Sequence, residues 1–251
     1  MQLTRRAFLS TLTLAAACVV LPTTASAKPE PTKNGGRHEK FNAEAQKGGY
    51  DVLFIGDSLT EGWDGGGENG GADVWAKKIA PLKAAKFGIG GEKTGNILWR
   101  VQNGNFAGAG NPKVVVLLAG TNDNRVSRRN RNPNPNEPVE GIRAIISAIQ
   151  KRKPDAKILV LGILPLYKDP EAAWRKVNER TNKLLPALAD GKRVFFKNIN
   201  STFINADGTL KGYGKKASDF YHGDEIHLRK PGYEAFADAV LPEVKRILAL
   251  R

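Results

Sequence analysis

The sequence contains little cysteine and little histidine. One cysteine, Cys18, and three histidines are present among 251 residues. A single thiol cannot form a disulfide within the chain, and nothing in the sequence indicates a metal site built from cysteines. Histidine is the side chain that takes up and releases protons near neutral pH, so the three histidines are the first candidates for acid–base chemistry.

Long hydrophobic runs are also missing. The apolar run at residues 12–21 is too short for a membrane-spanning helix, which needs about 20 residues. It follows the basic pair Arg5 and Arg6 and precedes the small residues 25–27, which is the order found in export signals. Paired arginines are typical of the twin-arginine type. We therefore expect residues 1–27 to be an export signal, the mature chain to have no transmembrane segment, and the protein to be periplasmic or extracellular in a bacterium.

Cys18 allows a second interpretation, in which the signal is lipidated. The cysteine follows three alanines, but the apolar run continues past it through residues 19–21. Cleavage after Ala27 is therefore favoured, and the mature chain would begin at Lys28 without any cysteine.

Acidic residues are scarce relative to basic ones. The chain has 25 Asp and Glu against 39 Lys and Arg, a formal net charge of +14. Removing residues 1–27 takes away two arginines and no acid, which lowers +14 by two to +12. Such a surface favours acidic partners such as anionic polysaccharide, envelope phosphate groups or nucleic acid. For an exported protein we rank polyanionic wall or matrix material first and expect no nucleic-acid partner.

From residue 50 onward, apolar runs alternate with helical patterns. Continuous apolar runs such as VVVLLA and ILVLGI are typical of strands that are covered on both faces. The candidate strands are 52–55, 86–89, 114–119, 158–163 and 193–199, and the candidate helices are 74–82, 94–101, 139–151, 172–189 and 232–250. This alternation predicts an α/β sandwich with a mostly parallel five-stranded sheet in one domain, residues 50–251. Residues 28–49 are expected to form a tether and a short helix around residues 38–45.

Polar turns follow the first three candidate strands. They read GDSLTEGW, GIGGEKTGN and GTNDNR, and in parallel sheets ligands bind beyond the carboxyl ends of the strands. Taken alone, Ser58 would be an ordinary helix N-cap and Asn122 an Asx-turn. The same positions also suit a nucleophilic hydroxyl and an oxyanion donor.

Two familiar motifs fail at these turns. The nucleophile elbow G-x-S-x-G would need glycine where Thr60 stands. A phosphate-binding P-loop would need glycine before Lys93, and Glu92 occupies that position. The sequence therefore does not indicate the α/β-hydrolase version of a serine enzyme, and we expect no nucleotide at the glycine turn.

The segment ASDFYHGDEIHL contains the pattern D-x-x-H twice. Asp219 precedes His222 by three residues, and Asp224 precedes His227 by three residues. An aspartate at this spacing can orient a histidine ring and stabilise its charged form. The spacing alone leaves both pairs open as a catalytic dyad, whereas His38 in the amino-terminal segment is expected to be structural.

Four blocks in order, GDSL, GIGG, GTND and a carboxyl-terminal D-x-x-H, resemble the SGNH (GDSL) hydrolase family. The resemblance implies a flavodoxin-like three-layer α/β/α sandwich. It assigns Ser58 as the nucleophile, His227 as the base and Asp224 as its partner, because the family's D-x-x-H-L stands just before the closing helix. The implied oxyanion hole consists of the backbone N–H groups of Ser58 and Gly91 and the side-chain amide of Asn122. His222 has the spacing but not this context.

A closer likeness is to the catalytic subunits of intracellular platelet-activating factor acetylhydrolase and their bacterial relatives. The stretches RHEKF, DVLFIGDS, FGIGG, ILWRVQNG and PKVVVLLAGTN carry it. Glu92-Lys93 stands where those relatives often have Asp-Thr, and the Arg-rich loop 125–131 is unusual. The resemblance implies a serine esterase for short acyl groups without a cofactor, and it leaves a homodimer open. The predicted signal adds export, and the basic surface makes an acylated glycan as well as a small molecule a candidate substrate. A catalytically inactive glycan-binding module and an acyltransferase are the alternatives.

Overall fold

The structure is a computed structural model that describes residues 27–127 and 130–250. The predicted export signal, including Cys18, lies outside the described residues, apart from its last residue, Ala27. Two arginines of the loop 125–131 lie outside them as well. Within the described part, no helix is long and apolar enough to cross a membrane.

A five-stranded parallel sheet forms the centre of the molecule, with strand order β2-β1-β3-β4-β5. The strands are β1 (Val52–Gly56), β2 (Ala84–Gly88), β3 (Val114–Leu118), β4 (Lys157–Leu161) and β5 (Val194–Lys197). Every residue of the central strands β1 and β3 is buried, as expected for strands with helices on both faces.

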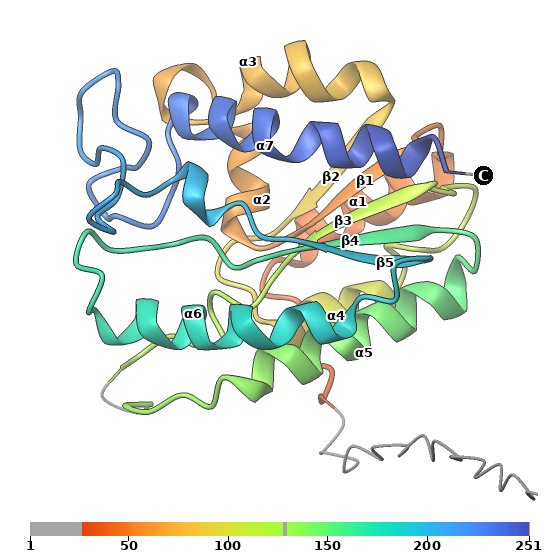
Figure 1. The fold of residues 1–251 in the computed structure, drawn as a ribbon. Coiled ribbons are helices and arrows are strands. Elements are labelled where there is room, and N and C mark those ends of the chain that lie inside the picture. Colours follow the sequence, from red (N-terminus) through yellow and green to blue (C-terminus); the bar gives the residue numbers. More distant parts are fainter. Residues whose placement is uncertain (1–26, 128–129, 251) are drawn as a thin grey trace, which may run out of the picture.

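Helices cover both faces of the sheet (Figure 1). One hydrophobic core joins the sheet to α1 (Gly35–Lys47), α4 (Thr94–Gln102) and α5 (Asn136–Arg152), and α6 (Ala173–Leu184) lies in the same layer. The second core joins the opposite face to α3 (Ala72–Val74) and to α7 (Lys230–Leu248). The predicted three-layer α/β/α sandwich with a parallel five-stranded sheet is therefore confirmed.

The segment predicted as one helix at residues 74–82 is irregular. After α3 the chain forms a π-helical turn at Trp75–Ile79 and a 3-10 turn at Ala80–Leu82. Pro81 lies in the 3-10 turn and has no backbone N–H to continue a ladder of helical hydrogen bonds. The predicted helix 172–189 is likewise shorter, because α6 gives way to a 3-10 turn that contains Pro186.

The amino-terminal helix is longer than predicted and belongs to the domain core. The Asn34 side chain accepts a hydrogen bond from the Arg37 backbone N–H and caps α1. Phe41 stacks on Phe87 of β2 with a ring-centroid distance of 4.7 Å. His38, predicted to be structural, is buried in this helix, and its ring lies 5.0 Å from that of Trp99.

Candidate active site

Ser58 is the first residue of α2 (Ser58–Glu61), directly beyond the carboxyl end of β1. Asp57 caps this short helix, because its carboxylate accepts a hydrogen bond from the Leu59 backbone N–H at 3.0 Å. The strand-to-helix turn thus presents the Ser58 hydroxyl at the edge of the sheet. There its Oγ lies 2.9 Å from Nε2 of His227.

His227 is held by Asp224, three residues earlier in the chain. Nδ1 of the ring lies 2.5 Å from Asp224 Oδ2, and Asp224 Oδ1 accepts the backbone N–H groups of Ile226 and His227, each at 3.0 Å. With a carboxylate at Nδ1, we assign the proton of the neutral ring to that nitrogen. Nε2 is then free to accept the hydroxyl proton of Ser58.

The environment of Asp224 favours its ionised form. Partial burial by itself raises the pKa of this carboxyl, but the hydrogen bonds from the His227 ring and from two backbone N–H groups outweigh the burial. The net effect lowers the pKa of Asp224 below its usual value. A carboxylate that stays ionised can stabilise a positively charged imidazole during a reaction.

The second D-x-x-H pair does not form a dyad. Nε2 of His222 lies 3.2 Å from the carbonyl oxygen of Asn69, in the glycine-rich loop 65–71. Asp219 instead accepts the backbone N–H of Lys216 at 2.9 Å. The structure therefore brings Asp224 and His227 to Ser58, and it ties His222 and Asp219 to neighbouring loops.

The glycine turn after β2 lies beside the Ser58 turn. A Cβ placed on Gly90 would be 3.8 Å from Cβ of Ser58, and the Gly90 N–H donates to Glu61 Oε2 at 2.5 Å. Gly91 has a φ of +71°, a left-handed conformation that glycine adopts without steric cost. After β3, Asn122 donates its side-chain Nδ2–H to the carbonyl oxygen of Glu92 at 2.9 Å. Three strand ends thus supply the candidate nucleophile and the candidate oxyanion donors.

A buried ion pair, which the sequence analysis missed, lies behind these turns. Arg100 Nε donates to Glu92 Oε2 at 2.7 Å, and both side chains are fully buried. Arg100 also donates to the carbonyl oxygens of Phe87 and Gly56, the residues at or next to the ends of β2 and β1. No sequence signal marked Arg100, because an arginine on a predicted helix ordinarily faces solvent.

Two buried carboxyl groups flank the candidate residues. Burial raises the pKa of Asp57 to about 7, and Oδ2 of Asp57 has no hydrogen-bond partner among the described residues. Burial also raises the pKa of Asp123, which accepts the backbone N–H and the hydroxyl of Thr94. Asp57 therefore exchanges its proton near neutral pH, although neither carboxyl touches the Ser58 hydroxyl.

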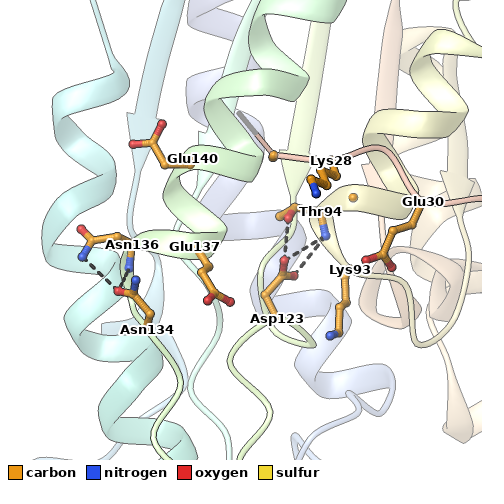
Figure 2. Close-up of a pocket in the computed structure, with 11 residues that line it drawn as sticks. Lys28, Glu30, Lys93, Thr94, Asp123, Asn134, Asn136, Glu137 and Glu140 are labelled. Atoms are coloured by element: carbon orange, nitrogen blue, oxygen red, sulfur yellow. Dashed lines mark hydrogen bonds between the residues drawn. The ribbon is translucent and has the colours of Figure 1, made fainter. Parts of the chain in front are cut away.

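A cavity of about 500 Å³ adjoins the glycine turn, and Figure 2 shows the side chains that line it. Lys93 and Asp123, which follow Glu92 and Asn122 in the chain, form one wall, and the first residues of α5 form another. The full set of other lining residues is Ala27, Lys28, Glu30, Thr94, Gly95, Asn134, Asn136, Glu137 and Glu140.

No group of histidine, cysteine and acidic side chains suited to a metal ion occurs among the described residues.

Comparison with known sequences identifies relatives over most of the chain. The sequence model of the GDSL-like lipase/acylhydrolase family matches residues 54–235. Platelet-activating factor acetylhydrolase IB subunit alpha1 from Bos taurus is 32% identical over 231 residues, which cover 89% of this chain and 90% of the bovine one.

Solved structures share the fold at lower identity. A GDSL-like lipase from Bacteroides thetaiotaomicron superimposes with a TM-score of 0.63 at 20% identity, covering 84% of this chain and 97% of the other. A carbohydrate acetylesterase from Sinorhizobium meliloti has a TM-score of 0.58 at 20% identity, covering 79% of this chain and 99% of the other. These similarities show that the three-layer arrangement is shared.

Proposed function

Because this chain belongs to the GDSL-like lipase/acylhydrolase family and is a carboxylic ester hydrolase, we propose that it cleaves short acyl esters, acetyl esters first, through an acyl-enzyme on Ser58. The observation that carries this mechanism is the chain of contacts Asp224–His227–Ser58, at 2.5 and 2.9 Å. These distances support proton transfer from the hydroxyl without rearrangement of the side chains.

In the first half of the proposed reaction, Ser58 Oγ attacks the ester carbonyl carbon while His227 Nε2 takes the hydroxyl proton. The carbonyl oxygen becomes an oxyanion, which the N–H groups of Ser58 and Gly91 and the amide of Asn122 stabilise. Each such donor is worth roughly 3–4 kcal/mol of transition-state stabilisation. When the carbon–oxygen bond to the alcohol breaks, His227 gives its proton to the leaving alcohol.

In the second half, water replaces the alcohol. His227 removes a proton from the water, the resulting hydroxide equivalent attacks the acyl carbon, and the bond to Ser58 Oγ breaks. The proton returns from His227 to Ser58, and the carboxylic acid leaves. No cofactor takes part in this scheme, because one imidazole handles every proton transfer.

An acylated anionic glycan is the substrate class that we favour. The names of two similar proteins, an acetylhydrolase and a carbohydrate acetylesterase, support an acetyl group and a sugar. Basic side chains are the reason for proposing a negatively charged glycan. Arg125 lies over the Trp174 ring, and Arg131, Arg180 and Lys183 line a hollow of about 430 Å³ next to α6. A polyanion near these residues would neutralise part of the protein's excess positive charge.

The experiment compares the wild type with Ser58→Ala on p-nitrophenyl acetate, and then on acetylated uronic-acid polysaccharide and acetylated xylan. We expect the variant to lose hydrolysis of all three esters. The wild type should prefer the anionic polysaccharide at low salt and lose that preference at high salt, because salt screens the attraction. A rate on the neutral xylan that equals or exceeds the rate on the anionic polysaccharide would contradict the substrate assignment.

Export is a separate part of the proposal. The basic pair, the apolar run and the small residues at 25–27 support a twin-arginine signal that is cleaved after Ala27. Replacing Arg5 and Arg6 with lysine in the full chain should keep the protein in the cytoplasm of a bacterial host. Unchanged appearance in the periplasm would contradict the twin-arginine assignment.

A further inference from the structure

The N-terminal arm, residues 28–34, lies along the domain between the predicted cleavage site and α1. The Glu30 backbone N–H donates to the carbonyl oxygen of Gly95 at 3.0 Å. The Asn96 side chain donates to the carbonyl oxygen of Pro31 at 2.8 Å. Both partners belong to the first turn of α4. The arm, which the sequence predicts as a tether, is therefore fixed against the helix that follows the glycine turn.

The end of the arm contacts the glycine turn itself. The Thr32 hydroxyl donates to Glu92 Oε1 at 2.6 Å, and the Lys33 backbone N–H points at the same oxygen at 3.3 Å. The Lys33 ammonium group donates to the carbonyl oxygen of Gly91 at 2.6 Å. Two residues of the arm thus bind the two residues that follow Gly90.

Glu92 transmits these contacts into the buried interior. While Oε1 faces the arm, Oε2 accepts the Arg100 guanidinium, which in turn donates to the carbonyl of Gly56 at 3.1 Å, just before the Ser58 turn. A buried ion pair is tolerated when further hydrogen bonds satisfy both partners. Here Arg100 Nη1 is also bonded to the Asn105 side chain at 2.8 Å. The arm, the glycine turn and the end of β1 are therefore parts of one hydrogen-bonded network.

The opposite side of the turn is held as well. The Glu92 carbonyl oxygen accepts the Asn122 amide, and Arg37 of α1 donates through Nε to the carbonyl oxygen of Gly88 at 3.1 Å. Gly91 has no side chain with which to fix its own conformation, so the orientation of its N–H depends on these neighbours. An oxyanion donor is effective only when it is already aimed at the position where charge develops.

We propose that the N-terminal arm is part of the catalytic apparatus, and that Thr32 and Lys33 are positioning residues that act through Glu92 and Gly91 to aim the Gly91 N–H at the oxyanion. This inference rests on the proposed roles of Ser58 and Gly91. It extends the apparatus to a segment that precedes the residues matched by the family, 54–235. Catalysis then depends on a stretch that begins beside the predicted cleavage site.

The test uses Thr32→Val and Lys33→Met in the full chain, because each removes one side-chain donor, at a partly buried position for Thr32 and at an exposed position for Lys33. We expect kcat for p-nitrophenyl acetate to fall roughly tenfold in each variant, because a small misplacement of a catalytic group costs up to about 10²-fold. KM should stay within about twofold, because in the proposed mechanism neither substitution removes a group that contacts the small ester. The conservative variants Thr32→Ser and Lys33→Arg keep the donors and should retain kcat within about twofold.

A matched control is available at the other end of the sheet. The Lys153 ammonium group donates to the carbonyl oxygen of Gly108 at 3.2 Å, and both residues precede strands at their amino ends. Lys153→Met removes the same kind of bond and should leave kcat unchanged. The inference is overturned if Thr32→Val and Lys33→Met keep the wild-type kcat, if Lys153→Met loses as much, or if the loss equals the drop in folded fraction measured by circular dichroism.

The same kinetic measurements distinguish an error in the inference about the arm from an error in the proposed function. If the wild type hydrolyses the ester no faster than Ser58→Ala, the acyl-enzyme mechanism is wrong and the arm inference falls with it. If the wild type is active and Ser58→Ala is not, an undiminished kcat in the arm variants overturns the arm inference alone.

Discussion

At the scale of single residues, the two histidines of ASDFYHGDEIHL have different expected roles. His227 lies 2.9 Å from the Ser58 hydroxyl, and His222 contacts the backbone of the loop 65–71. We expect His227→Ala to lower kcat by about 10⁴-fold or more, because the hydroxyl loses its base. His222→Ala should retain most activity. Steady-state kinetics on p-nitrophenyl acetate measures both, and equal losses would contradict the assignment of the base.

Asp57 predicts a pH dependence of stability. Burial raises its pKa in the folded protein to about 7 from the ordinary value of 3.8. The folded state therefore binds the Asp57 proton more tightly than the unfolded state does. The resulting stabilisation is fully present below pH 3.8 and is lost as the pH rises through about 7.

Asp57→Asn removes this titration and keeps a neutral side chain of similar shape. Between pH 5 and pH 8 we expect the free energy of unfolding of the wild type to fall relative to that of the variant, by about 2.5 kcal/mol. Urea denaturation at both pH values measures the difference, and each protein serves as its own reference. A gap between the two proteins that does not change with pH would show that Asp57 is ionised throughout this range in the folded state.

At the scale of elements, the candidate site depends on a close approach between β2 and α2. A Cβ on Gly88 would lie 2.1 Å from the Glu61 backbone nitrogen and 2.4 Å from the Thr60 carbonyl carbon. Backbone atoms cannot move aside as a flexible side chain can. The helix that begins at Ser58 would have to shift away from the glycine turn.

We therefore expect Gly88→Ala to destabilise the protein by about 2–3 kcal/mol, in the range of overpacking substitutions. The control is Gly66→Ala, where a Cβ meets nothing within 4 Å and φ is −89°. Thermal unfolding measures both variants. Equal melting temperatures for the two would show that β2 and α2 can separate without cost.

The strands that are easiest to predict from the sequence are those buried on both faces, because burial requires an unbroken run of apolar residues. The central strands β1 and β3 are buried on both faces, so their apolar runs mark them to within a residue or two. The edge strand β2 begins two residues before its predicted start, because its alanines and Lys86 form a weak apolar pattern. The π-helical turn at Trp75–Ile79 has the same apolar residues as an α-helix and could not be distinguished from one.

The candidate catalytic residues could be proposed from the sequence because motifs at three strand ends, and the D-x-x-H-L before the closing helix, resemble those of the family. The network behind them could not. In the sequence, Glu92 stands out as a poor residue for binding phosphate and as a departure from the relatives, and no pattern distinguishes Arg100 from a solvent-facing residue of a helix. Their pairing depends on how α4 packs against β1 and β2, which no local pattern encodes. The contacts of Thr32 and Lys33 were hidden for the same reason.

At the scale of the whole molecule, three strand ends and the final loop before α7 meet at one edge of the sheet. Ser58, Gly91 and Asn122 follow β1, β2 and β3 in chain order, and the parallel topology places the carboxyl ends of these three strands side by side. Asp224 and His227 precede α7, and His227 reaches the Ser58 hydroxyl. The net positive charge of the chain belongs to the proposed substrate: an excess of basic residues would attract an acidic polymer over a longer range, before its ester reaches Ser58. In this proposal the fold positions the residues for catalysis, and the charge favours the encounter with substrate.

The proposed mechanism requires that Ser58 becomes acylated during turnover. Rapid mixing of the wild type with p-nitrophenyl acetate, an acid quench and mass spectrometry of the digested protein test it directly. We expect a burst of p-nitrophenol of up to one equivalent per chain when deacylation is slower than acylation. We also expect an acetyl group on the peptide that contains Ser58, and both signals should be absent in Ser58→Ala. Steady hydrolysis by Ser58→Ala at the wild-type rate, or acetylation at another side chain during turnover, would contradict it.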